Sequence, residues 1–175
     1  MGALAWWGVG AGLLALVAGA FGWGWLRLRR SVAEVTAAIA RVGIDDVPRL
    51  REECERVLLE KFSERLSLDR LEESARILSR RIDDGSLKSA FAKDDFWWYF
   101  VLPVGAYVGE LLRVNAGGEW KDSDGGGLEL VVSAGDDHAT TFPFDKVLKQ
   151  ATVGDKGDLY AYLVTAQKVG ELLQN

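Results

Sequence analysis

The sequence predicts an α+β protein: one N-terminal transmembrane helix, then a helical region, then a small three-stranded antiparallel meander with C-terminal helices. The first 26 residues carry no charged side chain, which is typical of a membrane span. Helical spacing of apolar residues follows, and it changes to strand-like alternation after Gly117–Gly118. We therefore expect three segments: an anchor at 1–30, a helical stalk or linker at 31–48, and a cytoplasmic α+β domain at 49–175.

The apolar N-terminal segment predicts a single-pass anchor. A helix over Ala3–Leu26 would be about 36 Å long, enough to cross a hydrocarbon core of ~30 Å. A cleaved signal peptide is the alternative, but its basic residues would precede a shorter apolar run. Here basic side chains only follow the run, so we expect the N-terminus outside and the domain on the cytoplasmic side of the membrane. The expected interface residues are Trp6, Trp7, Trp23, Trp25, Arg27, Arg29 and Arg30.

Small residues form one stripe of this expected helix. They are Ala5, Gly8, Gly12, Ala15, Gly19 and Gly22. Such steps let two helices approach closely in lipid, although glycine and alanine are also simply common in membrane helices. We expect the stripe to be a packing seam against integral-membrane protein subunits and lipid. The span has no His, Cys, Asp or Glu side chain, so it could not ligate a metal. In a host complex it could lie next to pigments or quinones only as a packing neighbour.

The remainder of the chain is acidic. Residues 31–175 hold 18 basic and 26 acidic side chains, a net charge of −8, which argues against nucleic-acid binding. The single cysteine, Cys54, excludes an intramolecular disulfide and fits a reducing compartment. Its spacing relative to Leu50 and Leu58 predicts a place on the core face of a helix.

Two amphipathic helices are expected first, one over Arg49–Phe62 and one capped by Ser67 and running to Ile82. Phe96–Val114 is apolar on all sides, which indicates a helix buried in a core or a membrane. Its uncharged part, Phe96–Gly109, has 14 residues, which is short for a span. We favour a central core helix that starts or kinks at Pro103, with a membrane-docking segment or second span as alternatives.

Three short strands are expected after this helix, at Glu119–Ser123, Leu128–Ala134 and His138–Phe142. Turn-forming residues separate them, which predicts an antiparallel meander. Helices over Pro143–Thr152 and Asp158–Leu173 complete the chain.

Three short motifs carry a resemblance. They are Gly105-Ala-Tyr-Val-Gly-Glu110, Gly117-Gly-Glu-Trp120 and Phe142-Pro-Phe-Asp-Lys146. The pattern resembles small bacterial domains of unknown function that pair such a helix with a Gly-Gly-x-Trp strand and a Pro-Phe step. The resemblance covers residues 95–173. It implies a fold and a bacterial source, and therefore a bacterial inner membrane for the anchor, and it brings no catalytic residue.

The chain offers little catalytic chemistry. His138 lies near Ser133 and Asp136 or Asp137, but adjacent strand residues face opposite ways, so a surface histidine is favoured over a triad. One histidine and one cysteine cannot make the usual zinc set, and Asp122-Ser-Asp124 lacks the later ligands of a calcium loop. We therefore expect no catalytic, cofactor-binding or metal-binding residue.

Glu110 is the most unusual ionisable residue, because it lies on the apolar helix. A buried carboxylate needs a partner or marks a site. A structural partnership, for example with Arg113, is the favoured interpretation.

These observations favour a non-catalytic, single-pass accessory subunit of an integral-membrane complex, with photosynthetic and respiratory complexes as candidate hosts. The alternative is a membrane-anchored cytoplasmic binding or regulatory module of the immunity type. In that alternative Trp97, Trp98 and Trp120 would form an exposed aromatic partner surface. An enzyme would need a polar pocket around Glu110, His138 or the Asp pairs.

Overall fold

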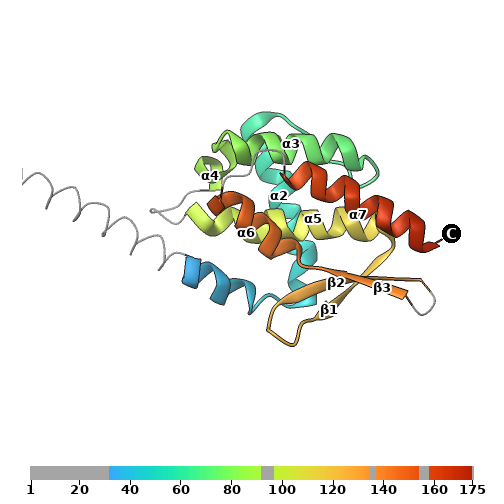
Figure 1. The fold of residues 1–175 in the computed structure, drawn as a ribbon. Helices are drawn as coiled ribbons and strands as arrows, with labels where there is room; N and C mark the ends of the chain where they lie inside the picture. Colours follow the sequence, from blue (N-terminus) through green and yellow to red (C-terminus); the bar gives the residue numbers. More distant parts are fainter. Residues whose placement is uncertain (1–31, 92–96, 135–136, 154–157, 175) are drawn as a thin grey trace, which may run out of the picture. The chain divides into compact units, whose positions relative to one another are not determined.

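A computed structural model describes residues 32–91, 97–134, 137–153 and 158–174 of the chain (Figure 1). The predicted anchor, with its seam and its interface residues, lies outside these ranges. Residues Val35–Asn175 form one compact unit. Within the described ranges, every helix is too short or too polar to cross a membrane.

The first part of the unit is helical. A helical segment over 32–39 and a 3₁₀ turn at Ile44–Asp46 lead into α2 (Val47–Phe62), which is followed by α3 (Leu71–Asp83) and α4 (Ser86–Phe91). Val35, Ile39 and Val42 are buried in the same core as α2. The folded unit therefore begins before residue 49, inside the segment 31–48 that the sequence suggested as a stalk.

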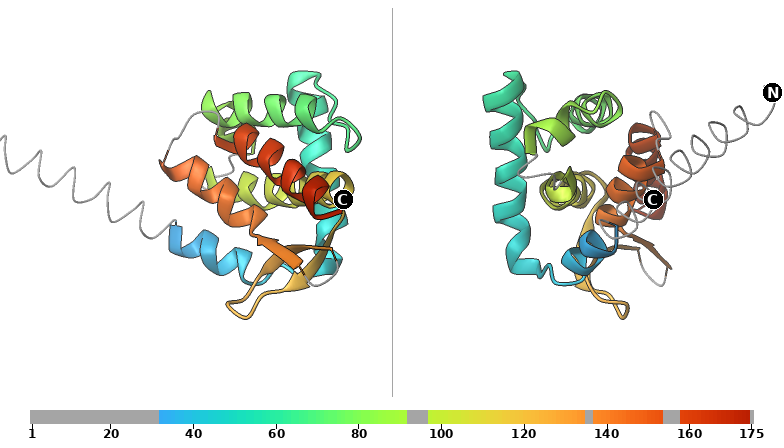
Figure 2. Two further views of the ribbon diagram at one scale, coloured as in Figure 1. Left: turned by 45° about the vertical axis from the view of Figure 1, so that its right-hand side comes forward. Right: turned by 90° about the vertical axis from the view of Figure 1, so that its left-hand side faces the viewer.

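α5 (Val101–Ala116) is the central helix, entered through a 3₁₀ turn at Trp97–Phe100. It packs against α2, α6 and α7, and the two views of Figure 2 show it between these helices. Pro103 lies in its first turn, where a missing backbone N–H breaks no helical hydrogen bond. Gly117 ends the helix with a left-handed φ of 75°. The prediction of a central core helix is confirmed.

The sheet is an antiparallel meander in the order β1-β2-β3, as predicted. Its strands are β1 (Gly118–Asp122), β2 (Leu128–Ala134) and β3 (Asp137–Thr141). Trp120 pairs with Leu130, and Leu130 pairs with Thr141, so these three side chains share one face. Gly126 and Gly127 both have positive φ in the turn between β1 and β2, a conformation that glycine adopts without strain.

The chain ends in α6 (Pro143–Val153) and α7 (Asp158–Gln174), and α7 packs on α3 and α5. The α+β class and the meander are thus confirmed, with two differences in the helical part. α3 begins at Leu71, because Ser67 is held in a turn in which its N–H and its C=O both bond to Ser74 Oγ. α4 was not expected, because its six residues are too few to show helical periodicity.

Candidate functional site

The three motifs that carry the resemblance meet in one place. Gly109 lies under the Trp120 ring, and a Cβ on Gly109 would come within 2.1 Å of that ring. Gly105 lies under Phe144 in the same way, with a Cβ approach of 2.5 Å. The Trp120 and Phe144 rings lie 5.9 Å apart between centroids. The two glycines, spaced one turn apart on α5, thus create the hollow that receives both aromatic rings.

Glu110 lies at the edge of this aromatic packing and is buried. Its carboxylate accepts two hydrogen bonds from Arg113, at 2.9 Å from Nε and 3.1 Å from Nη2, and one from Trp120 Nε1 at 2.8 Å. Burial raises the pKa of Glu110, but the hydrogen bonds from Arg113 and Trp120 outweigh it and hold the pKa below its ordinary value. The predicted partnership with Arg113 is confirmed. Trp120 is a partner that sequence spacing did not suggest.

This geometry corrects one expectation about the partner surface. Trp120 is only 8% exposed, and its indole N–H is committed to Glu110. It therefore does not form an exposed aromatic patch, because β1 turns its side chain inward onto α5. Trp97 and Trp98 lie in the 3₁₀ turn before α5, but their side chains are outside the described part of the structure.

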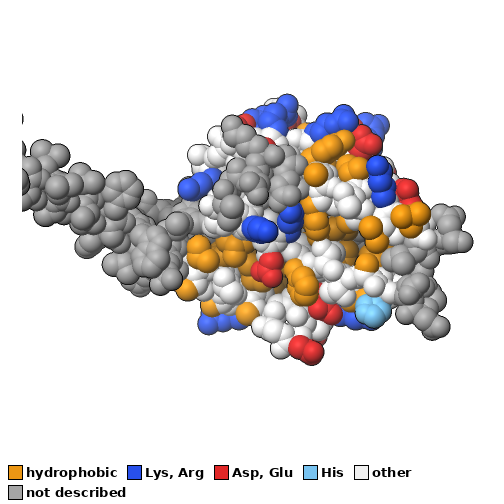
Figure 3. Space-filling view, in the orientation of Figure 1, with side chains coloured by type: hydrophobic (Ala, Val, Ile, Leu, Met, Phe, Trp, Pro, Cys, Tyr) orange, Lys and Arg blue, Asp and Glu red, His pale blue; other side chains and the backbone are white. Residues whose placement is uncertain are grey.

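A groove of about 420 Å³ opens between the inner face of β2–β3 and α7. Its walls are mostly apolar, and short side chains such as Ala139, Ala161 and Ala166 leave its space unfilled. Gly170 keeps α7 close to α5, because a Cβ there would approach Ala116 Cβ to 2.7 Å. Figure 3 shows hydrophobic side chains gathered over α7 on this face of the molecule. The size and the lining are those of a small-molecule site.

Five polar residues line the groove, and three of them, from three different elements, lie close together. Thr141 at the end of β3 and Tyr162 on α7 share a hydrogen bond. Lys146 on α6 places its Nζ 5.2 Å from the centroid of the Tyr162 ring. Burial raises the pKa of Tyr162 to about 12, so its hydroxyl keeps its proton at neutral pH. Sequence reasoning missed this site, because no motif links the three residues.

Among the residues that the structure describes, the other candidates from the sequence are not assembled into sites, and the side chains of Asp136 and Asp137 lie outside this description. Ser133 and His138 are paired across β2 and β3 and both are exposed, and no hydrogen bond joins their side chains within the described ranges. Asp122 ends β1, and in the following turn the Ser123 N–H donates a backbone hydrogen bond to the Gly127 carbonyl. Over the same ranges no group of three His, Cys, Asp or Glu side chains could hold a metal ion. Cys54 is fully buried on α2, as predicted.

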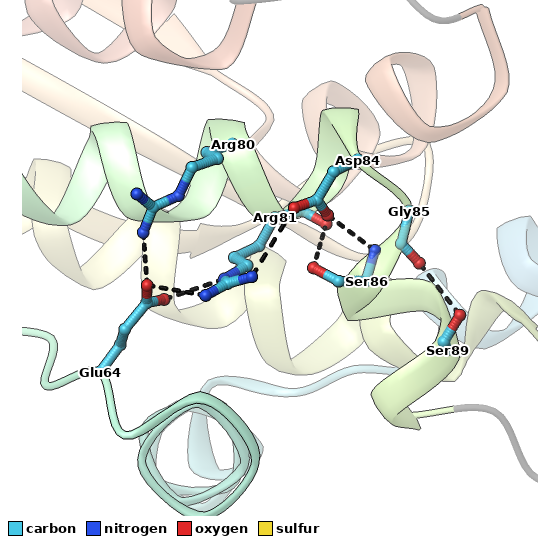
Figure 4. A network of polar contacts seen from close by, with 7 residues as sticks. All are labelled: Glu64, Arg80, Arg81, Asp84, Gly85, Ser86 and Ser89. Atoms are coloured by element: carbon cyan, nitrogen blue, oxygen red, sulfur yellow. Dashed lines mark hydrogen bonds and ion pairs between the residues drawn. The ribbon is translucent and has the colours of Figure 1, made fainter.

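A further polar network is structural. Glu64, in the loop after α2, accepts hydrogen bonds from Arg80 and Arg81 near the end of α3 (Figure 4). The Arg81 guanidinium also lies 4.2 Å from the centroid of the Phe62 ring. Asp84 accepts a 2.8 Å hydrogen bond from the Ser86 N–H at the start of α4. These contacts fix the α2–α3 loop and the α3–α4 corner.

Comparison with family models, curated proteins and solved structures found no match to this chain. The resemblance to small bacterial domains therefore stays a prediction. Its motif residues have a packing role in this fold.

Proposed function

We propose that this protein is a non-catalytic, single-pass accessory subunit of an integral-membrane complex. The observation that carries the proposal is the uncharged segment of 26 residues followed by Arg27, Arg29 and Arg30. In this proposal the protein lies in a bacterial inner membrane, with its N-terminus outside and the unit Val35–Asn175 in the cytoplasm.

The small-residue stripe is the proposed docking surface of the anchor. A helix that faces only lipid would be expected to carry Leu, Ile or Val along such a stripe, whereas small residues let a partner helix approach. The host would be a complex of integral-membrane subunits, with photosynthetic and respiratory complexes as candidates. The anchor would lie near their pigments or quinones without ligating a metal.

The test is co-purification in mild detergent of the full-length protein beside a Gly12→Leu/Gly19→Leu double variant. We expect the wild type to bring down a defined set of membrane subunits and the double variant to lose them. A Leu13→Ala/Leu14→Ala variant is the matched control, because it changes two apolar residues off the stripe. A wild type that purifies alone in every mild detergent would overturn the accessory role.

A membrane-anchored cytoplasmic binding or regulatory module is the second candidate, and the groove beside α7 favours it. An open apolar groove with a few convergent polar groups is the usual form of a ligand site. The two candidates differ in where the interaction lies. Loss of partners in the stripe variant supports the first, and an interaction that depends on groove residues alone supports the second.

A further inference from the structure

A pocket of about 260 Å³ lies where residues 36–40, the β1–β2 turn and the start of α6 meet (Figures 1 and 2). It is separate from the groove beside α7, because the two share no lining residue among those described. Its polar lining residues are Thr36, Ser123 and Asp145, and the other described lining residues are apolar or glycine. The described part of the lining therefore carries one formal charge, a negative one on Asp145.

Packing of the β1–β2 turn against residues 39 and 40 fixes the walls of this pocket. A Cβ on Gly127 would come within 3.0 Å of the Ile39 carbonyl oxygen, and a Cβ on Gly126 would lie 3.4 Å from the Ala40 Cβ. A Cβ on Gly125 would meet no atom closer than 3.9 Å. The turn thus lies directly against the helical segment, while small residues leave the space beside it unfilled.

Asp145 is a carboxylate without a protein partner. It lies in the first turn of α6, where the helix dipole favours its ionised form. No hydrogen bond or ion pair joins it to another residue of the described ranges. Burial raises its pKa above the ordinary value, so part of its hydration is lost in the fold. A bound cation would offset the free-energy cost of this desolvated charge.

Two neighbours of Asp145 in the pocket also suit a cation. Phe142 is 43% exposed, and the face of an aromatic ring attracts a positive charge. The Ser123 hydroxyl lines the pocket from the turn, and its oxygen can accept an N–H hydrogen bond. One carboxylate and one hydroxyl are too few oxygen ligands for Ca²⁺, which takes six to eight. The lining therefore matches a singly charged organic cation better than a metal ion.

We propose that this pocket binds a primary ammonium ion with a small apolar body. The ammonium donates hydrogen bonds to the Asp145 carboxylate and the Ser123 hydroxyl, and the body packs against Leu128 and Phe142. An anionic ligand is excluded, because Asp145 would repel it. The inference concerns the folded unit Val35–Asn175 and stands whether or not the anchor docks into a complex.

The test is a fluorine NMR titration of the full-length protein in phosphatidylcholine nanodiscs, with empty nanodiscs as the reference. The probe is 4-fluorobenzylamine, which is protonated at neutral pH, and 4-fluorobenzyl alcohol is its neutral match. We expect saturable one-to-one binding of the amine and about tenfold weaker binding of the alcohol. The N,N,N-trimethyl derivative keeps the charge but has no N–H donor, so it should also bind more weakly. Equal affinity for the amine and this derivative would contradict a site for primary ammonium ions.

Asp145→Asn tests the charge in the pocket. We expect it to weaken binding of the amine by about tenfold and to leave binding of the alcohol unchanged. Asp124→Asn is the matched control, because Asp124 is exposed, lies in the adjoining turn and does not line the pocket. An equal loss in both variants would show a general effect of surface charge and would overturn the assignment of Asp145. An unchanged preference for the amine in Asp145→Asn would do the same.

Ala40→Phe tests the location, because it places a ring in the pocket, and it should abolish binding of the amine. Ala37→Phe is its control, at an exposed position of the same helical segment that does not line the pocket. If circular dichroism shows that Ala40→Phe does not fold, Gly125→Leu obstructs the pocket from the turn. The proposal fails if the wild type shows no saturable binding of the amine, or if that binding survives in a folded obstructing variant.

Discussion

Replacing Glu110 by Gln tests the role assigned to the buried carboxylate. Glutamine has almost the same shape, so the substitution removes the charge with little change in packing. Its Oε1 can still accept the Trp120 N–H, but its amide N–H₂ then faces the N–H₂ of Arg113, and two donors cannot bond to each other.

The expected loss in the free energy of unfolding is about 2 kcal/mol at neutral pH. A hydrogen bond to a charged group contributes ~1.5–3 kcal/mol, and a neutral acceptor keeps roughly half of it, so the Trp120 bond loses about 1 kcal/mol. The Arg113 side chain is 43% exposed, so solvent screens its ion pair, and we assign that pair no more than about 1 kcal/mol.

The loss should depend on pH. The folded pKa of Glu110 lies below the ordinary value of 4.5, so the ionised form stabilises the fold above that value. This stabilisation is lost as the pH falls through the folded pKa. The difference between wild type and Glu110→Gln should therefore be constant near neutral pH and should narrow between about pH 5 and about pH 3.

The assay is urea unfolding of the full-length protein in mild detergent, followed by near-ultraviolet circular dichroism across this pH range. Glu119→Gln is the control, because its side chain is 80% exposed and the change should stay within about 0.5 kcal/mol. A Glu110→Gln effect no larger than this control, or one that does not change down to about pH 3, would refute the reasoning.

Three further outcomes are expected. Gly109→Ala should lower the free energy of unfolding by several kcal/mol, roughly as overpacking of a core does, because the new Cβ would displace the Trp120 ring. Gly125→Ala is the control and should be nearly neutral, because the nearest atom to its Cβ would be 3.9 Å away. Thermal melts of the two variants compare the two effects. Cys54 is fully buried, and burial raises the pKa of its thiol. Maleimide should therefore label Cys54 slowly in the folded protein and faster at the denaturant concentration of the unfolding midpoint. Fast labelling of the folded protein without denaturant would contradict this. Glu64→Gln should lower stability by about 1 kcal/mol in low salt and by less in high salt, and an effect independent of ionic strength would argue against an electrostatic role.

Much of the fold could be predicted from the sequence, because the patterns that indicate helices, strands and turns depend on residues close together in the chain. Alternating apolar residues and glycine-containing turns predicted the bounds of β2, Leu128–Ala134, as the structure has them. The predicted bounds of β1 and β3 differ from those in the structure by one residue. The start of α3 could not be predicted, because Ser67 resembles an N-cap until its tertiary bond with Ser74 is known. The burial of Val35 likewise depends on contacts with distant elements.

The sites were less predictable, because they depend on which distant side chains meet. Arg113 could be named as a partner of Glu110, since three residues along a helix place the two side chains on one face. Trp120 could not, because the turn at Gly117 decides which way β1 directs its ring. The groove depends on short side chains on β3 and α7 facing each other, and no sequence pattern records that pairing.

The central position of α5 has a consequence for how the protein is made. α5 is covered by α2, which is synthesised before it, and by α6 and α7, which are synthesised after it. Because α7 follows all these elements in the sequence and packs on both α3 and α5, the core stays open until α7 has left the ribosome. A stalled or truncated chain would expose the apolar faces of α3 and α5 to proteases and chaperones, so cells should degrade incomplete copies quickly.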